Sequence, residues 1–155
     1  MTGFDSYNLC LTGEIGRTLA TPSGGLNEHI RCLNDDDIED INKMKLRTIH
    51  FAWDNPNDDL EGKFRTFAQR FRRASNIGMV YCLTNFENVS LKEHIERALT
   101  RIYKLSEMGY DPYLMIYNKP NAPVEIKDLQ RWCNNKIIFK TVPRFEDYKP
   151  TREMN

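Results

Sequence analysis

The residues of this chain with the most reactive side chains are four cysteines and three histidines, and they are scattered along the sequence. Cys10, Cys32, Cys82 and Cys133 include no close pair, whereas zinc and iron–sulfur sites usually take two ligands from one turn. We therefore expect buried free thiols, with Cys82 inaccessible inside a strand. The histidines show no metal-binding spacing either. His50 lies among apolar residues, and we expect a hydrogen-bonded histidine in the core.

Asp54 is a stronger candidate for chemistry because it directly follows an apolar, β-rich segment. At the carboxyl end of a buried strand, its carboxylate could bind a hydroxyl or ammonium group of a substrate. It could equally form a turn beside Asn55 and Pro56. The sequence leaves both interpretations open.

Alternating strand and helix patterns position these residues from residue 26 onward. Apolar segments of strand length cover residues 26–33, 47–53, 78–83, 112–117 and, as a fifth strand, 137–141. Apolar residues at helical spacing occur between them, at residues 35–44, 60–71, 90–105 and 126–133. This alternation predicts an α/β fold with a parallel sheet and right-handed crossovers. Ligands of such folds bind at the rim where the strands end.

Length and charge restrict the class of protein. The 155 residues suit one domain, which we place at residues 26–148, after an irregular segment at 1–25 and before a flexible tail at 149–155. The 22 basic and 22 acidic residues cancel, which argues against a dedicated nucleic-acid or membrane-surface binder. No apolar stretch has the length of a membrane span and no signal-peptide pattern is present. We therefore expect a cytoplasmic protein.

The charges are nevertheless unevenly distributed. Residues 62–73 carry five basic groups and no acid, whereas residues 34–61 carry nine acids and three bases. A solvated helix face is the usual role of such a basic segment. The alternative is a non-enzymatic interaction module that binds nucleic acid through Arg65, Arg70, Arg72 and Arg73.

Six segments, taken together, carry a resemblance to a known family. They are residues 29–33 (HIRCL), 49–54 (IHFAWD), 80–86 (VYCLTNF), 109–117 (GYDPYLMIY), 129–136 (LQRWCNNK) and 144–148 (RFEDY). In this order and spacing they resemble the C-terminal half of uncharacterised radical SAM (S-adenosylmethionine) proteins of anaerobic bacteria and their phages. The resemblance runs from about residue 26 to residue 148. It implies that the parallel βα repeats form part of a TIM-like barrel.

The resemblance also implies a cofactor. In that superfamily the early strands bring a 4Fe-4S cluster bound by a C-x-x-x-C-x-x-C loop, and the later strands complete the S-adenosylmethionine pocket. This sequence has segments like the later strands but not the cysteine loop. We therefore expect no independent radical chemistry, and a cluster only if a missing N-terminal half supplies it.

Carried over by position, the resemblance suggests seven residues for S-adenosylmethionine. Arg31 would pair with the carboxylate of the cofactor, and Asp54 would hold a ribose hydroxyl or a substrate amine. The remaining five would contact adenosine or line the floor of the pocket beside it: Thr84, Asn85, Phe86, Met115 and Tyr117.

A partial barrel would leave one edge of its parallel sheet unpaired, which usually invites association. We therefore expect a homo-oligomer, a partner chain at that edge, or a covering role for residues 1–24.

Overall fold

A computed structural model describes residues 25–27, 30–43, 48–72 and 78–151 of the chain. Its strands are β1 (Gly25–Asn27), β2 (Thr48–Ala52), β3 (Met79–Thr84) and β4 (Asp111–Ile116). Its helices are α2 (Asp35–Lys43), α3 (Glu61–Arg70), α4 (Leu91–Glu107), α5 (Val124–Asn134) and α6 (Lys136–Thr141). Three short 3-10 turns complete it: η1 (Ile30–Cys32), η2 (Lys119–Asn121) and η3 (Phe145–Asp147).

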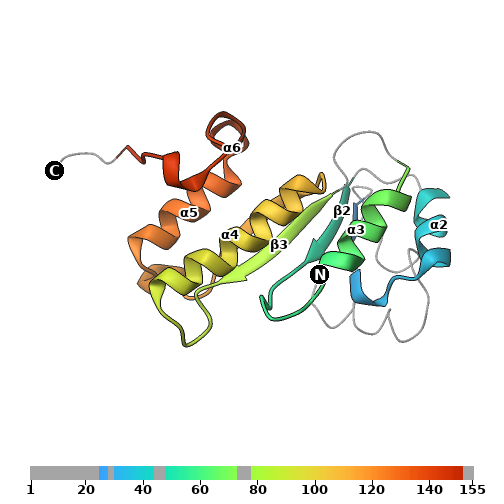
Figure 1. The fold of residues 1–155 in the computed structure, drawn as a ribbon, viewed down its shortest axis with the longest axis horizontal. Coiled ribbons are helices and arrows are strands. Elements are labelled where there is room, and N and C mark those ends of the chain that lie inside the picture. Colours follow the sequence, from blue (N-terminus) through green and yellow to red (C-terminus); the bar gives the residue numbers. More distant parts are fainter. Residues whose placement is uncertain (1–24, 28–29, 44–47, 73–77, 152–155) are drawn as a thin grey trace.

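The four strands form one open sheet in the order β1-β2-β3-β4, and each neighbouring pair is parallel. Helices connect successive strands (Figure 1), as parallel pairing requires. The predicted α/β class with a parallel sheet is therefore confirmed. Among the described residues, no helix is both long enough and apolar enough to span a bilayer.

Two predicted strands are wrong in whole or in part. The segment 26–33 contributes only two of the three residues of β1, Leu26 and Asn27, and then includes η1. The segment 137–141 is helical, as α6. The Asn135 side chain accepts hydrogen bonds from the backbone N–H groups of Ile137 and Ile138 at 3.1 and 3.2 Å. This cap begins a helix, although the apolar residues that follow favour a strand.

Helices α2 and α4 also begin at a side-chain cap, whereas α3 and α5 begin without one. The Ser90 hydroxyl accepts the Glu93 backbone N–H at 3.2 Å and begins α4. Asn34 and Asp37 cap the start of α2 reciprocally. The Asn34 side chain accepts the Asp37 backbone N–H at 2.9 Å, and the Asp37 carboxylate accepts the Asn34 backbone N–H at 2.8 Å. Such caps satisfy N–H groups that have no partner within the helix.

The two faces of the sheet differ. One face is buried under α3, α4 and α5 (Figure 1) and contributes the apolar core residues Ile49, Phe51, Trp53, Val80, Cys82 and Leu114. Phe51 packs edge-to-face on Phe64 and Phe67 of α3, with ring centroids 5.8 and 5.0 Å apart. The opposite face is called the open face below and carries His50, Ala52, Tyr81, Leu83, Tyr113 and Met115, all half-buried or exposed.

Side chains of α5 and α6, instead of a fifth strand, form hydrogen bonds with the backbone at the outer edge of β4. Asn134 accepts the Leu114 backbone N–H at 2.8 Å and donates to the Leu114 carbonyl at 2.9 Å. Gln130 donates to the same carbonyl at 3.0 Å, and Lys136 Nζ donates to the Pro112 carbonyl at 2.9 Å. The Asn134 amide thus replaces one residue of a neighbouring strand. The association expected at an unpaired edge is opposed at β4, because these backbone groups are already bonded.

We predict that Asn134→Leu lowers the free energy of unfolding by about 2 kcal/mol, since it leaves the Leu114 N–H and one carbonyl bond unsatisfied. The measurement is urea denaturation, together with sedimentation to detect association through the exposed edge. Asn88→Leu, at an exposed loop position, is the matched control. Equal stability of the two variants would contradict a protective role for Asn134.

Candidate functional site

Two asparagines in the left-handed backbone region shape the carboxyl end of the sheet. Asn85 (φ 66°) directly follows β3, and Asn118 (φ 51°) lies two residues beyond β4. Asparagine tolerates this region better than most residues with a side chain. Both strands therefore end in tight turns, and Tyr117 lies at the rim between β4 and the turn at Asn118.

Tyr117 is fixed at this rim through its backbone. Its N–H donates to the Thr84 carbonyl at 3.0 Å, and its carbonyl accepts the Asn85 side-chain amide at 3.1 Å. Its side chain nevertheless remains 59% exposed. The structure thus brings together three residues that the sequence had suggested for the cofactor.

Two further predicted residues lie at the same rim with exposed apolar side chains. Phe86 is 37% exposed beside Asn85, and Met115 is 45% exposed on the open face of β4. Thr84, by contrast, is 2% exposed and points into the helix-covered face. Only its backbone reaches the rim. Exposed apolar side chains at the ends of two neighbouring strands make this rim a candidate binding surface.

A buried arginine, Arg101 of α4, joins the ends of β2 and β3 below this rim. It is 2% exposed. Its guanidinium donates to the carbonyls of Trp53, Asp54 and Leu83 at 2.6, 3.0 and 2.9 Å, and to Arg97 of its own helix at 3.2 Å. Burial lowers the pKa of Arg101, and negative charge on Asp54 is among the opposing influences.

Arg101 did not emerge from the sequence analysis, although a signal was present. It lies three residues after Ala98 and four before Leu105, both of which are fully buried. This spacing places it on the apolar face of α4. A cation at such a position must find acceptors inside the protein, because burying an unpaired charge is costly.

The other two predicted residues lie at the end of β2, away from Tyr117. Asp54 has an exposed side chain, and its backbone carbonyl accepts from Arg101. Arg31 of η1 forms an ion pair with Asp58 in the loop after β2. The Trp53 indole N–H donates to the Asp58 carbonyl at 3.1 Å and holds this loop against the core. Arg31 thus has a carboxylate partner within the chain.

Aromatic side chains cross the open face from β2 to β4. Tyr81 packs edge-to-face on His50 and on Tyr113, with centroids 5.6 and 5.7 Å apart. The Tyr81 hydroxyl lies 3.3 Å from His50 Nδ1. His50 is therefore hydrogen-bonded as expected, but it lies half-buried on the open face instead of in the core.

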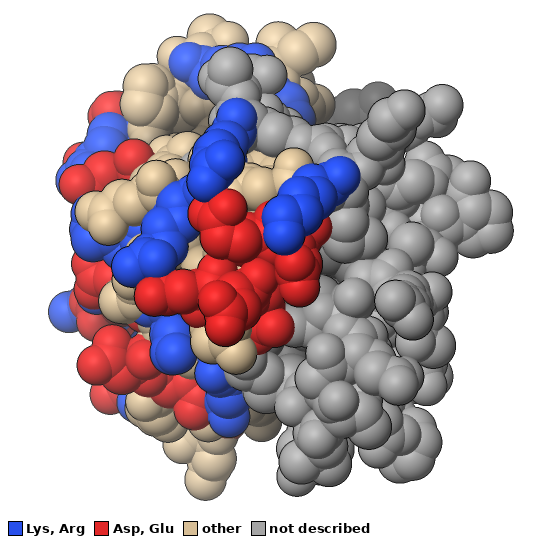
Figure 2. Space-filling view, turned by 90° about the vertical axis from the view of Figure 1, so that its right-hand side faces the viewer, with Lys and Arg blue, Asp and Glu red and all other residues tan. Residues whose placement is uncertain are grey.

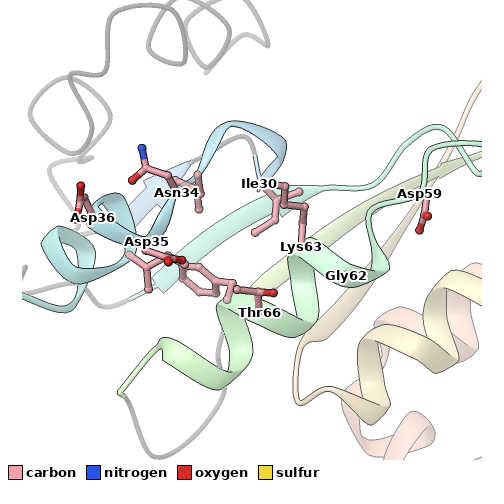
Figure 3. A pocket seen from close by; sticks show the side chains of 11 residues that line it. Ile30, Asn34, Asp35, Asp36, Asp59, Gly62, Lys63 and Thr66 are labelled. Atoms are coloured by element: carbon pink, nitrogen blue, oxygen red, sulfur yellow. The ribbon is translucent and has the colours of Figure 1, made fainter.

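The largest described cleft, about 950 Å³, lies between α2 and α3. Its polar groups do not converge: Figure 3 shows Asp59 at the opposite end from Asp35 and Asp36. The acidic residues of α2 gather on this side of the molecule with basic side chains around them (Figure 2). Acids in the first turn stabilise the positive end of α2. We therefore assign no ligand to this cleft.

The basic segment at residues 62–73 is largely compensated by acids. Arg65 pairs with Glu61 of its own helix. Arg70 pairs with Asp35, and Arg72 forms a two-pronged contact with Glu39, both on α2. Arg73 lies outside the described residues. The pairs of Arg70 and Arg72 join α2 to the end of α3 and the residues after it, and all three pairs reduce the positive potential available to a nucleic acid.

The two cysteines whose side chains the structure describes, Cys82 and Cys133, do not fit an iron–sulfur cluster. Cys82 and Cys133 are buried free thiols, and burial raises the pKa of each to about 12. Cluster ligation needs thiolates. Cys10 and the side chain of Cys32 lie outside the described part of the chain. In the part described, no three His, Cys, Asp or Glu side chains are grouped to hold a metal ion.

Comparison of the chain with family models, curated proteins and solved structures finds no match. The similarity to radical SAM proteins thus stays a prediction from the six sequence segments.

We predict that Arg101→Met lowers the free energy of unfolding by about 3 kcal/mol, because several strand-end carbonyls lose a charged donor. Urea denaturation measures the change. The control, Arg65→Met, removes an exposed i,i+4 ion pair and should cost about 0.5 kcal/mol. A comparable loss in both variants would show that Arg101 is no more important than a surface arginine.

His50 should make the stability of the folded chain depend on pH. Burial lowers the pKa of His50 below its ordinary value of 6.5. The unfolded chain therefore binds a proton at a higher pH than the folded chain, and stability falls as the pH drops through about 6.5. Unfolding free energies of the wild type and His50→Gln at pH 7.5 and 5.5 measure this. The variant should lose less stability on acidification. An identical loss in both proteins would contradict the idea that His50 causes the pH dependence.

Proposed function

We propose that this chain is a radical SAM-like βα module that binds S-adenosylmethionine, or a nucleoside like it, at the carboxyl ends of β3 and β4. It would retain the later strands of a TIM-like barrel and perform no radical chemistry by itself. The supporting observation is the exposure of Phe86, Met115 and Tyr117 around a rim whose backbone is rigidly bonded.

The strand order also supports the barrel part of this proposal. A barrel sector needs parallel strands in sequential order with the helices on one face, and β1 to β4 have this arrangement. In a barrel the open face would line the interior. His50, Tyr81 and Tyr113 on that face would then lie below a ligand at the rim.

The chemistry of the rim suits a nucleoside. Aromatic and thioether side chains provide apolar contact for a flat base. The Asp54 carboxylate, at the end of β2, can accept hydrogen bonds from ribose hydroxyls. The S-adenosylmethionine sulfonium would provide the reactive carbon–sulfur bond, and a cluster from another polypeptide would be needed to cleave it. The chain's own residues would bind and orient the cofactor.

Calorimetric titration with S-adenosylmethionine and S-adenosylhomocysteine tests this function. We expect both to bind, and we expect the double variant Met115→Ala/Tyr117→Ala to bind at least about tenfold more weakly, a loss of about 1.4 kcal/mol. The control is Ile137→Ala, which removes a 79% exposed side chain from α6 and should leave affinity unchanged. Absence of heat with both ligands would rule out the proposal.

The alternative function, nucleic-acid binding through residues 62–73, has weaker support because three of its arginines have acidic partners. Titration with single- and double-stranded oligonucleotides at two salt concentrations tests it. Counterion release would make the affinity fall steeply with salt. Such a slope without nucleoside binding would favour the alternative.

A further inference from the structure

An open groove of about 590 Å³ lies along the outer side of β4, between α5 and the connection that follows the strand. Its lining residues are Tyr113, Lys119, Lys127, Gln130, Arg131, Asn134 and Asn135. This volume lies within the range of small-ligand sites. The groove is separate from the exposed apolar side chains at the rim, none of which lines it.

The groove contains basic residues and no acid. Lys119, Lys127 and Arg131 supply three positive charges, and Asp128, the acid next to Lys127, does not line it. Within the described part of the chain, no ion pair neutralises any of the three. The two other clefts described, near α2 and beside Arg101, both include carboxylates.

Two of the three cations lie at a spacing at which like charges repel, and Asp128, three residues before Arg131, offsets part of this repulsion. Lys127 and Arg131 are four residues apart in α5 and therefore lie on the same face. Like charges at this spacing destabilise a helix slightly. A bound anion would reverse the sign of this contribution, because it would attract both side chains and Lys119.

The floor of the groove is rigid. The Asn134 and Gln130 amides are held by their bonds to Leu114 at 2.8–3.0 Å. Tyr113 is held edge-to-face against Tyr81. A ligand would therefore meet a preorganised surface, so binding would order only the long side chains.

We propose that this groove binds the phosphate groups of a diphosphate or longer polyphosphate. Lysine and arginine are the usual protein ligands of phosphate, and arginine adds a two-pronged contact. A single phosphate ester carries about −1.5 to −2 charges at pH 7, which would leave part of the positive charge unmatched. A diphosphate matches it more closely. Tyr113 would provide an aromatic surface for a base attached to the phosphates.

Calorimetric titration of the full chain with sodium pyrophosphate, ADP and adenosine tests the proposal. We expect pyrophosphate and ADP to bind. The double variant Lys127→Gln/Arg131→Gln should weaken both by about tenfold or more, since two charged contacts are lost. Adenosine alone measures binding of the base and ribose at the rim. ADP that binds more tightly than pyrophosphate, and loses this advantage in Lys127→Gln/Arg131→Gln, would identify a nucleotide as the source of the phosphates. Pyrophosphate that binds as tightly as ADP would identify a free polyphosphate.

The matched control is Lys63→Gln/Lys140→Gln, which makes the same change in net charge at exposed positions outside the groove. Its affinity for pyrophosphate should stay within about twofold of the wild type. Equal weakening in both double variants would overturn the proposal, because the effect would then come from net charge alone. No binding of pyrophosphate or ADP by the wild type would also overturn it. The pyrophosphate results do not bear on the nucleoside site at the rim, which is tested with S-adenosylmethionine and different variants.

Discussion

The buried guanidinium of Arg101 is the interaction on which the carboxyl end of this sheet depends. It donates to carbonyls at the ends of β2 and β3 and so fixes both strand ends relative to α4. A buried charge is tolerated only where such acceptors surround it. The rim that carries Phe86 and Tyr117 is therefore stabilised by the hydrogen bonds of Arg101. These bonds lie on the same face of the sheet as the apolar core.

The two faces of the sheet differ in what covers them, and the edge at β4 is bonded to side chains instead of to another strand. The face under α3, α4 and α5 contains the core, while the open face carries an aromatic row that includes Tyr81. At β4, the Asn134 amide takes the place of a neighbouring strand at Leu114. Addition of a further strand at β4 is therefore opposed, because the bonding groups at Leu114 are already occupied.

Sequence patterns predicted the middle of the fold better than its ends. The strands β2, β3 and β4 and the helices α3, α4 and α5 lie where apolar periodicity indicated them. The segment 137–141 was wrong because its composition favours a strand, whereas the Asn135 cap favours a helix. The segment 26–33 was partly wrong because apolar alternation cannot distinguish a strand from a 3-10 turn over so few residues.

The sequence by itself determined the α/β class, the parallel sheet and which loops reach the rim, because these follow from the period of apolar residues and the chirality of the chain. The resemblance of its segments to radical SAM proteins also suggested Asn85, Phe86, Met115 and Tyr117, which the structure exposes or fixes at that rim. Only the tertiary structure decided that Arg31 pairs with Asp58, that Arg101 is buried and that α5 completes the edge of β4. These contacts join residues far apart in the chain, so their partners are set by packing and not by local pattern.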